Sequence, residues 1–322
     1  MSVPGVHLLP LPTPFQIGAV NAYLLDGPPL TLIDCGPHTQ EALDALCAHF
    51  DRLGYRLKDL KQLLITHPHM DHFGLAGAVR TQSGCRVVAH PGAVDKIADF
   101  KGHYAREQGF FFKFLVSMGM PEQNARLLTE LPQSFSVLAP PAHVEKTLSE
   151  GMRLQVGDLG LEVLETPGHS PASLCFYDPE QRALFAGDHL IDGITPNPLL
   201  EMPPHPGAKR PRSLIQYLDS LEKVAPLALE VVFSGHRNLI TDPQRVIDTS
   251  FEHQRKRSEN VLKFLTQAPL TAYQLMEKLF PNLPATEQFL GMSEAVGHLE
   301  WLQAQGKVGL RSEQGVVYFE PL

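Results

Sequence analysis

The segment 63–74, "LLITHPHMDHFG", concentrates residue types that bind metal ions. His67, His69, Asp71 and His72 lie within six residues, directly after a short apolar run. Neutral imidazole is the commonest metal ligand in proteins, and carboxylates bind the same ions. On a turn after a strand, alternate residues converge, so His67 and His69 are expected to share one metal ion while Asp71 and His72 serve a second. Histidines on proline-containing turns are often only solvated, but this tight spacing favours metal binding.

Three later segments supply further ligand types in the same local context. His169 follows the apolar run "LEVLET", Asp188 follows "ALFAG", and His236 follows "VVF". Layered α/β proteins place their sites just beyond the carboxyl ends of strands. The sequence therefore predicts that these three side chains join the cluster of residues 67–72.

The elements that position these residues alternate between strand and helix. Strand-like runs at "AVNAYLL", "LTLIDCGP", "KQLLIT" and "CRVVAH" are interleaved with helical patterns at 39–53 and 75–81. This alternation predicts an α/β layered core. Residues 95–141 interrupt it with an insertion that is rich in Phe and Met and looks helical.

The alternation ends near residue 250. Three helical segments and a terminal hairpin follow, which predicts a small winged-helix domain over 251–322 after a catalytic domain over 1–250. A chain of 322 residues also favours about two domains.

Composition and charge narrow the class of protein. The chain has 43% hydrophobic and 19% charged residues, which is typical of a globular protein. No apolar run approaches the roughly 18 residues that span a bilayer, so a membrane-embedded protein is not expected. The amino terminus resembles no secretory signal, and the four cysteines stand far apart. Reduced thiols in the cytoplasm are therefore expected.

The charge balance argues against nucleic acid as a partner. The net charge is -8, and residues 251–322 carry seven basic residues against eight glutamates. The helix that would enter the DNA groove in a winged-helix domain, "SEAVGHLEWLQAQ", contains Glu294 and Glu300 but no Lys or Arg. Because phosphate contacts dominate such binding, DNA is not expected as a partner and RNA is disfavoured.

The motifs "THPHMDH", "PGHS", "GD" and "GH", in this order, resemble those of the metallo-β-lactamase superfamily. The likeness extends over roughly residues 5–245 and implies an αββα sandwich that binds two divalent metal ions. It also relates Asn21 and Asp34 to the family's opening hairpin and structural aspartate. It implies one ion on His67, His69 and His169, a second on Asp71, His72 and His236, and Asp188 as the bridge between them.

The resemblance also implies a chemistry. A hydroxide that bridges the two ions would attack an electron-poor carbonyl or phosphorus, and Asp71 would serve as a catalytic residue that steers the proton. A ligand set of nitrogen and carboxylate without thiolate favours zinc, with iron and manganese as alternatives.

A bridging aspartate is similar to that of glyoxalase II, lactonase and RNase Z relatives. A small-molecule ester, thioester or lactone is the expected substrate. The carboxy-terminal domain resembles that of the β-lactamase-like protein 2 branch, whose relatives include a single-strand endoribonuclease, and this is the main rival function. A non-enzymatic metal-binding sensor is a third alternative.

Two segments could select the substrate. The Phe/Met insertion is either a lid over an apolar pocket, or a structural feature such as a dimer contact or an extra core layer. Lys209, Arg210 and Arg212 form a basic loop that is either solvated or binds a substrate carboxylate or phosphate.

Overall fold

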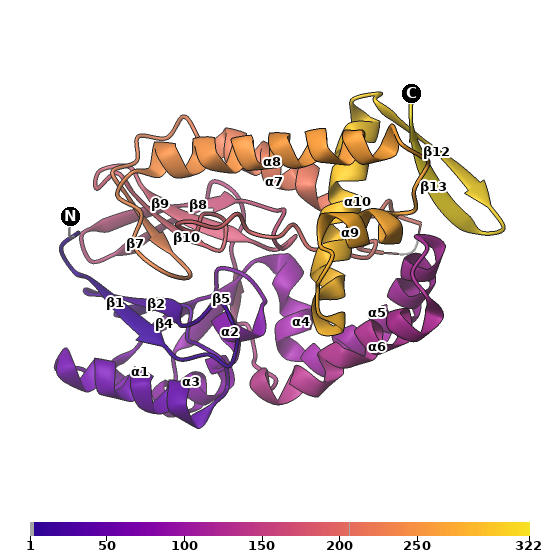
Figure 1. The fold of residues 1–322 in the computed structure, drawn as a ribbon. Helices are drawn as coiled ribbons and strands as arrows, with labels where there is room; N and C mark the ends of the chain where they lie inside the picture. The colour runs from indigo at the N-terminus through magenta and orange to yellow at the C-terminus, as the bar shows by residue number, and fades with distance from the viewer. Residues whose placement is uncertain (1–2, 206) are drawn as a thin grey trace.

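Two β-sheets packed face to face lie at the centre of the computed structural model, which describes residues 3–205 and 207–322 (Figure 1). The first sheet has the order β1-β2-β3-β4-β5-β6, antiparallel from β1 to β3 and parallel from β3 to β6. Its strands are β1 (Val6–Leu11), β2 (Val20–Leu25), β3 (Thr31–Ile33), β4 (Gln62–Leu64), β5 (Arg86–Ala89) and β6 (Lys146–Thr147).

The second sheet has the order β11-β10-β9-β8-β7. All its pairs are antiparallel except β10 with β11. Its strands are β7 (Arg153–Val156), β8 (Leu159–Glu165), β9 (Leu174–Asp178), β10 (Ala183–Gly187) and β11 (Val231–Ser234).

Strand periodicity divides the apolar residues between two faces of each sheet. In the segment after Gln62, Leu64 packs between the sheets while Leu63 and Ile65 face the outer helices. Phe185 likewise packs between the sheets, and Leu184 faces outward. This alternation follows from successive side chains pointing to opposite faces of a strand. Both faces of each sheet are therefore buried.

Helices cover the two outer faces and complete the predicted αββα sandwich. Helices α1 (Gln40–Arg52) and α3 (Ala76–Ser83) pack on the first sheet, as the patterns at 39–53 and 75–81 predicted. Helix α7 (Ser213–Val224) and the first half of α8 (Pro243–Leu265) pack on the second. Short helical pieces are α2 (Met70–Phe73), α4 (Val94–Ala98) and 3₁₀ turns at Leu57–Asp59, Pro91–Ala93, Phe135–Leu138 and Ala285–Glu287.

The Phe/Met insertion and the carboxy-terminal residues form one further core. The insertion is helical, as predicted, and consists mainly of α5 (Phe100–Ser117) and α6 (Glu122–Ser134). Its buried Phe111 and Leu115 share a hydrophobic cluster with Leu275 and Met292 of the carboxy-terminal module, defined here as residues 251–322. Figure 1 shows α5 and α6 beside this module. Of the structural alternatives for the insertion, the extra core layer is thus present within a single chain.

The carboxy-terminal module has the predicted order of helices and hairpin. After α8 come α9 (Ala272–Leu279), α10 (Gln288–Ala304), β12 (Val308–Glu313) and β13 (Val316–Pro321). Helix α8 runs without a break across the predicted boundary at 250/251, since its Val246 packs on the second sheet and its Val261 in the further core. The assignment of this module to the winged-helix class stays a prediction.

The remaining expectations concern thiols and membranes. All four cysteines are free; Cys35, Cys85 and Cys175 are buried and Cys47 is partly buried. Among the described residues, no helix is both long enough and apolar enough to cross a bilayer.

Candidate metal centre

The structure brings all seven predicted ligand residues to one end of the two sheets. Residues 67–72 follow β4, and the other three residues follow β8, β10 and β11. Within the described chain their ligand atoms form three overlapping groups, and the atoms of each group lie within 4.8 Å of one another. The groups are His67, His69 and His169; His67, His72 and Asp188; and Asp71, His72 and His236.

Asp188 lies between the two predicted halves of the cluster. Its Oδ1 is 3.4 Å from His72 Nε2, and its Oδ2 is 3.5 Å from both His169 Nε2 and His236 Nε2. Asp71 Oδ2 is 3.4 Å from His236 Nε2. One carboxylate therefore faces nitrogen atoms from both halves, as the expected bridging role requires.

Hydrogen bonds at the opposite ring nitrogen orient four of the histidines. Each contacts a protein oxygen through Nδ1, which leaves Nε2 directed toward the cluster, an arrangement typical of metal-binding histidines. The oxygens are Thr66 Oγ1 for His67 at 3.0 Å, Asp34 Oδ2 for His72 at 2.7 Å, Asn197 O for His169 at 2.9 Å and Ala19 O for His236 at 2.9 Å. The fifth histidine, His69, has the opposite orientation, with its Nδ1 3.0 Å from His169 Nε2.

The donor set fits a metal ion. His67 Nε2, His72 Nε2 and Asp188 Oδ1 are buried and have no hydrogen-bond partner, and each such atom costs about 1–3 kcal/mol if it stays unsatisfied. The 3.0 Å between His69 Nδ1 and His169 Nε2 suits two nitrogens that each lie about 2.0–2.1 Å from one ion. A bound cation would satisfy these atoms together.

The electrostatics differ between the two halves. Burial lowers the pKa of His67 and His69 well below its usual value, so both rings are neutral and free to coordinate. Burial also opposes the charged form of His72, but the carboxylates of Asp188 and Asp34 outweigh it and raise its pKa well above the usual value. The pKa of Asp188 lies well below the usual value despite its burial, because His236 and His72 stabilise the carboxylate.

Asp34 and Asn21, the two residues related to the family by resemblance, brace the loops of the cluster. Asp34 accepts hydrogen bonds from Thr66 N at 2.8 Å and from Thr66 Oγ1 at 2.7 Å, in addition to the bond from His72. Asn21 Nδ2 donates to Ser234 O at 3.0 Å and to Arg237 O at 2.9 Å, on either side of His236. A residue of the first sheet thus fixes the loop after β11 of the second sheet, which carries His236.

Gly235 permits the close approach of these loops. A Cβ atom at this position would lie 2.3 Å from Asp188 Oδ1 and 2.9 Å from His72 Cε1. Both separations are far shorter than ordinary contacts, so only glycine allows β11 to end directly behind the cluster.

A buried polar group beside the cluster was not singled out from the sequence. Lys96 is 7% exposed and Glu107 4% exposed, and partly buried Glu201 lies with them. Burial disfavours the charge of Lys96, yet Tyr104, Glu201 and Glu107 outweigh it and raise its pKa. Burial raises the pKa of Glu201 to about 7. Tyr104 belongs to the same group, since its side chain acts on Lys96.

The basic loop has a structural contact. Arg210 forms an ion pair with Glu300 of α10 and stacks on Phe114 of α5, with its guanidinium carbon 5.1 Å from the ring centroid. Its guanidinium therefore links the insertion to the carboxy-terminal module. Lys209 and Arg212 remain the candidates for binding a substrate carboxylate or phosphate.

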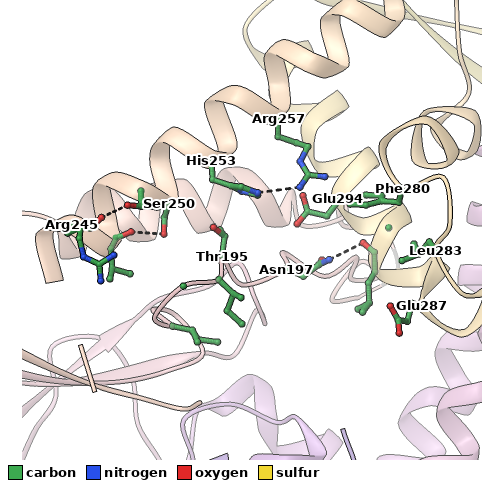
Figure 2. A pocket seen from close by; sticks show the side chains of 17 residues that line it. Thr195, Asn197, Arg245, Ser250, His253, Arg257, Phe280, Leu283, Glu287 and Glu294 are labelled. Atoms are coloured by element: carbon green, nitrogen blue, oxygen red, sulfur yellow. Dashed lines mark hydrogen bonds between the residues drawn. The ribbon is translucent and has the colours of Figure 1, made fainter. Parts of the chain in front are cut away.

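Two cavities adjoin the loops of the metal centre. The first, of about 450 Å³, lies between residues 191–197 and helices α8 and α10. Figure 2 shows Arg245, His253 and Arg257 on α8 at its wall, with Glu294 on α10 opposite. The second, of about 710 Å³, lies between α5, α6, residues 14–17 and the start of α10, and Met70 lines it.

The sequence also matches known families. Residues 16–236 match the profile described as "Metallo-beta-lactamase superfamily", and residues 258–322 match "Metallo-beta-lactamase-like, C-terminal domain".

Relatives and solved structures match along nearly the whole chain. The Bacillus subtilis (strain 168) protein described as "Probable metallo-hydrolase YqjP" is 34% identical over 322 residues, covering 100% of this chain and 99% of the relative. The "Beta-lactamase-like protein 2 homolog" of Drosophila melanogaster is 26% identical, covering 92% of this chain and 86% of the relative. The crystal structure of a metallo-beta-lactamase family protein from Thermus thermophilus is similar with a TM-score of 0.82, 30% identity and 99% coverage of both chains.

Proposed function

Because this chain belongs to the metallo-beta-lactamase superfamily and is similar along its whole length to a protein described as "Probable metallo-hydrolase YqjP", we propose that it hydrolyses a small-molecule ester, thioester or lactone. The observation that carries the proposal is the convergence of His67, His69, His169, Asp71, His72, His236 and Asp188 around buried, unpaired ligand atoms. The reaction adds water to the carbonyl carbon and breaks its bond to sulfur or oxygen. The products are a carboxylate, a proton and a thiol or alcohol.

We assign two divalent ions to the cluster. Three histidines, His67, His69 and His169, would hold one ion, and Asp71, His72 and His236 the other, with Asp188 facing both. Nitrogen and carboxylate ligands without thiolate favour zinc, with iron or manganese as alternatives. Bound ions of this kind lower the pKa of a water molecule to about 7 and polarise the substrate carbonyl.

Asp71 has a second role in this proposal. Burial opposes its charge, but His72 and His236 stabilise the carboxylate and lower its pKa. Its side chain is 14% exposed, whereas that of His236 is 1% exposed. An ionised carboxylate at this position can accept a hydrogen bond from the attacking water and orient it.

The named activities of two relatives that match only part of the chain support hydrolysis of a thioester. The protein described as "Acyl-coenzyme A thioesterase MBLAC2" of Gallus gallus is 31% identical over 104 residues, which cover 31% of this chain and 34% of the relative. A "Hydroxyacylglutathione hydrolase" of Rhodopseudomonas palustris is 30% identical over 146 residues, covering 45% and 39%. Both matches are partial, so they support the reaction class and not the substrate.

The rival function, cleavage of single-stranded RNA, is opposed by charge. The net charge of -8 repels a polyanion, and Arg210 of the basic loop is neutralised by Glu300. A sensor role without catalysis is opposed by the presence of all seven ligand residues beside a cavity of substrate size.

A substrate panel tests the proposal. Metal-reconstituted protein is assayed against thioesters, lactones, a phosphodiester and single-stranded RNA, beside His69→Ala as the control. We expect turnover of at least one carboxylic ester or thioester, and its loss in His69→Ala together with reduced metal content. Cleavage of RNA that is lost in His69→Ala, without turnover of any ester or lactone, would overturn the proposal.

A further inference from the structure

The larger cavity is apolar along most of its wall. Of about 710 Å³, it has the size of a small-molecule site. Apolar and aromatic side chains of α5, α6 and α10 form the wall, among them Phe111, Leu128, Leu131, Phe289 and Leu290. Along this apolar part of the wall a charged ligand would lose its hydration without gaining partners, whereas a hydrocarbon group would gain from burial.

One end of this cavity is formed by residues that are neighbours of candidate metal ligands in the chain. Met70, which lines the cavity, stands between the ligand residues His69 and Asp71 in the chain. Leu199, another lining residue, follows shortly after Asn197, whose carbonyl oxygen contacts His169 Nδ1. The cavity is therefore bounded by two segments that also position metal ligands.

Helix α5 gives the cavity a direction. The first turn of α5 lies near the segment of candidate metal ligands. Its Phe100 ring centroid is 6.1 Å from that of Phe73, the residue that follows His72. Further along, Phe111 contacts Phe289 of α10 at 5.3 Å. From Tyr104 to Phe111 the helix rises roughly 10 Å.

The two ends of the cavity differ in polarity. Tyr104 and Glu107 form a polar end beside Lys96. Phe111, Phe289 and Leu290 make the far part mainly apolar, and the polar side chains there, Gln16 and Glu287, bond to each other at 3.2 Å. This arrangement suits a molecule with a polar reacting group and an apolar tail.

The smaller cavity does not suit a hydrocarbon. Arg245 at its wall pairs with Asp192 at 3.0 Å, and Arg257 lies 3.3 Å from His253 (Figure 2). An apolar group placed there would cut these polar side chains off from water.

We propose that the larger cavity binds the acyl chain of a medium-chain ester or thioester, with the carbonyl carbon at the end beside Met70 and Tyr104. This inference rests on the proposed function, because it identifies the acyl part of the substrate. It also gives the Phe/Met insertion and the carboxy-terminal module a common role. Neither closes the cavity alone, since α5 and α6 form one wall and residues 286–290 another.

A pair of leucines on α6 provides a matched test. Leu131 is partly buried and lines the cavity, whereas Leu127, one turn earlier, is 45% exposed and is not part of the lining. Leu131→Trp should fill the cavity, and Leu127→Trp adds the same ring to the surface. On the carboxy-terminal side, Leu290→Trp, with Leu310→Trp on the exposed hairpin as its control, tests the opposite wall.

The main measurement is kcat/KM across a series of thioesters from acetyl to palmitoyl. In the unmodified protein we expect kcat/KM to rise roughly fourfold for each methylene buried, up to a medium chain length. Leu131→Trp and Leu290→Trp should lower kcat/KM for decanoyl thioester roughly tenfold more than kcat/KM for acetyl thioester, at equal metal content. Both control variants should behave as the unmodified protein.

Calorimetric binding of decanoate separates the two proposals. We expect decanoate to bind the metal-loaded protein and to bind Leu131→Trp more weakly. Hydrolysis without chain-length dependence and without decanoate binding would overturn the acyl site and leave the proposed function standing. Decanoate binding that Leu131→Trp weakens, without hydrolysis of any ester or thioester, would overturn the proposed function and retain the cavity as an acyl-binding site.

Discussion

His72 Nδ1 donates a hydrogen bond to Asp34 Oδ2 over 2.7 Å, and both side chains are almost completely buried. Because His72 Nε2 lies in the candidate metal cluster, Asp34 fixes the ring of a proposed metal ligand from the protein side. Asp34 itself has a positive φ of 56° at the end of β3, which the bonds from Thr66 and His72 help to maintain.

Asp34→Asn should weaken metal binding. The amide would present N–H groups where the carboxylate now accepts three hydrogen bonds, so the His72 ring would lose its anchor. Loss of such an outer partner typically costs about 10–100-fold in metal affinity. Competition with a chelator measures the change. Asp26→Asn, which alters the partly exposed pair between His7 and Asp26, is the control and should leave the affinity unchanged.

Gly235→Ala should disrupt the centre by contact alone. The new Cβ would press on Asp188 Oδ1 and His72, and relief requires moving one ligand or the end of β11. We expect lower metal content per chain, measured by elemental analysis, with the fold retained. Gly109→Ala is the matched control, because its Cβ meets no atom within 4 Å. In the middle of α5 it should stabilise the protein by about 0.5–1 kcal/mol. Equal metal content in the two variants would contradict this account.

Removal of metal should lower the stability of the whole protein. The ligands come from loops of both sheets, so a bound ion joins the two halves of the sandwich. A metal that binds only the folded state adds about 2.7 kcal/mol at a hundredfold excess over its Kd. Differential scanning calorimetry should therefore show a higher Tm with metal than after dialysis against chelator. If metal addition leaves the Tm of His67→Ala unchanged, the metal stabilises the protein at this site. If it raises the Tm of His67→Ala as much as that of the unmodified protein, the metal binds elsewhere.

Glu201 should make stability depend on pH. Burial raises its pKa from 4.5 to about 7, with a further upward contribution from Glu107, while Lys96, His103 and Arg210 act in the opposite direction. The folded state thus holds a proton that the unfolded chain releases near pH 4.5. The contribution of this carboxyl to stability is complete below pH 4.5 and is lost as the pH rises to about 7.

Glu201→Gln should remove that part of the pH dependence. Urea unfolding at several pH values should show that the stability of the variant relative to the unmodified protein increases from pH 4.5 to pH 7. Glu130→Gln, at an exposed position in the interior of α6, is the control and should show no comparable increase. A constant difference for Glu201→Gln would disprove the prediction.

Local sequence determined the layered core and the candidate ligands. Leu64 and its neighbours alternate between two buried faces because a strand has a period of two, and this period is visible without any structure. The ligand residues were identified because each follows an apolar strand, and strand ends gather at one edge of a sheet. The bounds of α1 followed closely from its apolar spacing, whereas α3 extends two residues beyond the predicted end at Thr81.

Only the tertiary structure decided what covers the Phe/Met insertion and what orients the ligands. Periodicity shows that Phe111 belongs to an apolar face, but the residue that meets it, Phe289, lies far along the chain, and no local pattern encodes that pairing. The oxygens of Ala19 and Asn197 that orient His236 and His169 belong to the backbone, which every residue shares. Lys96 likewise resembles any surface lysine in the sequence, because its burial depends on α5 and on Glu201 from distant loops.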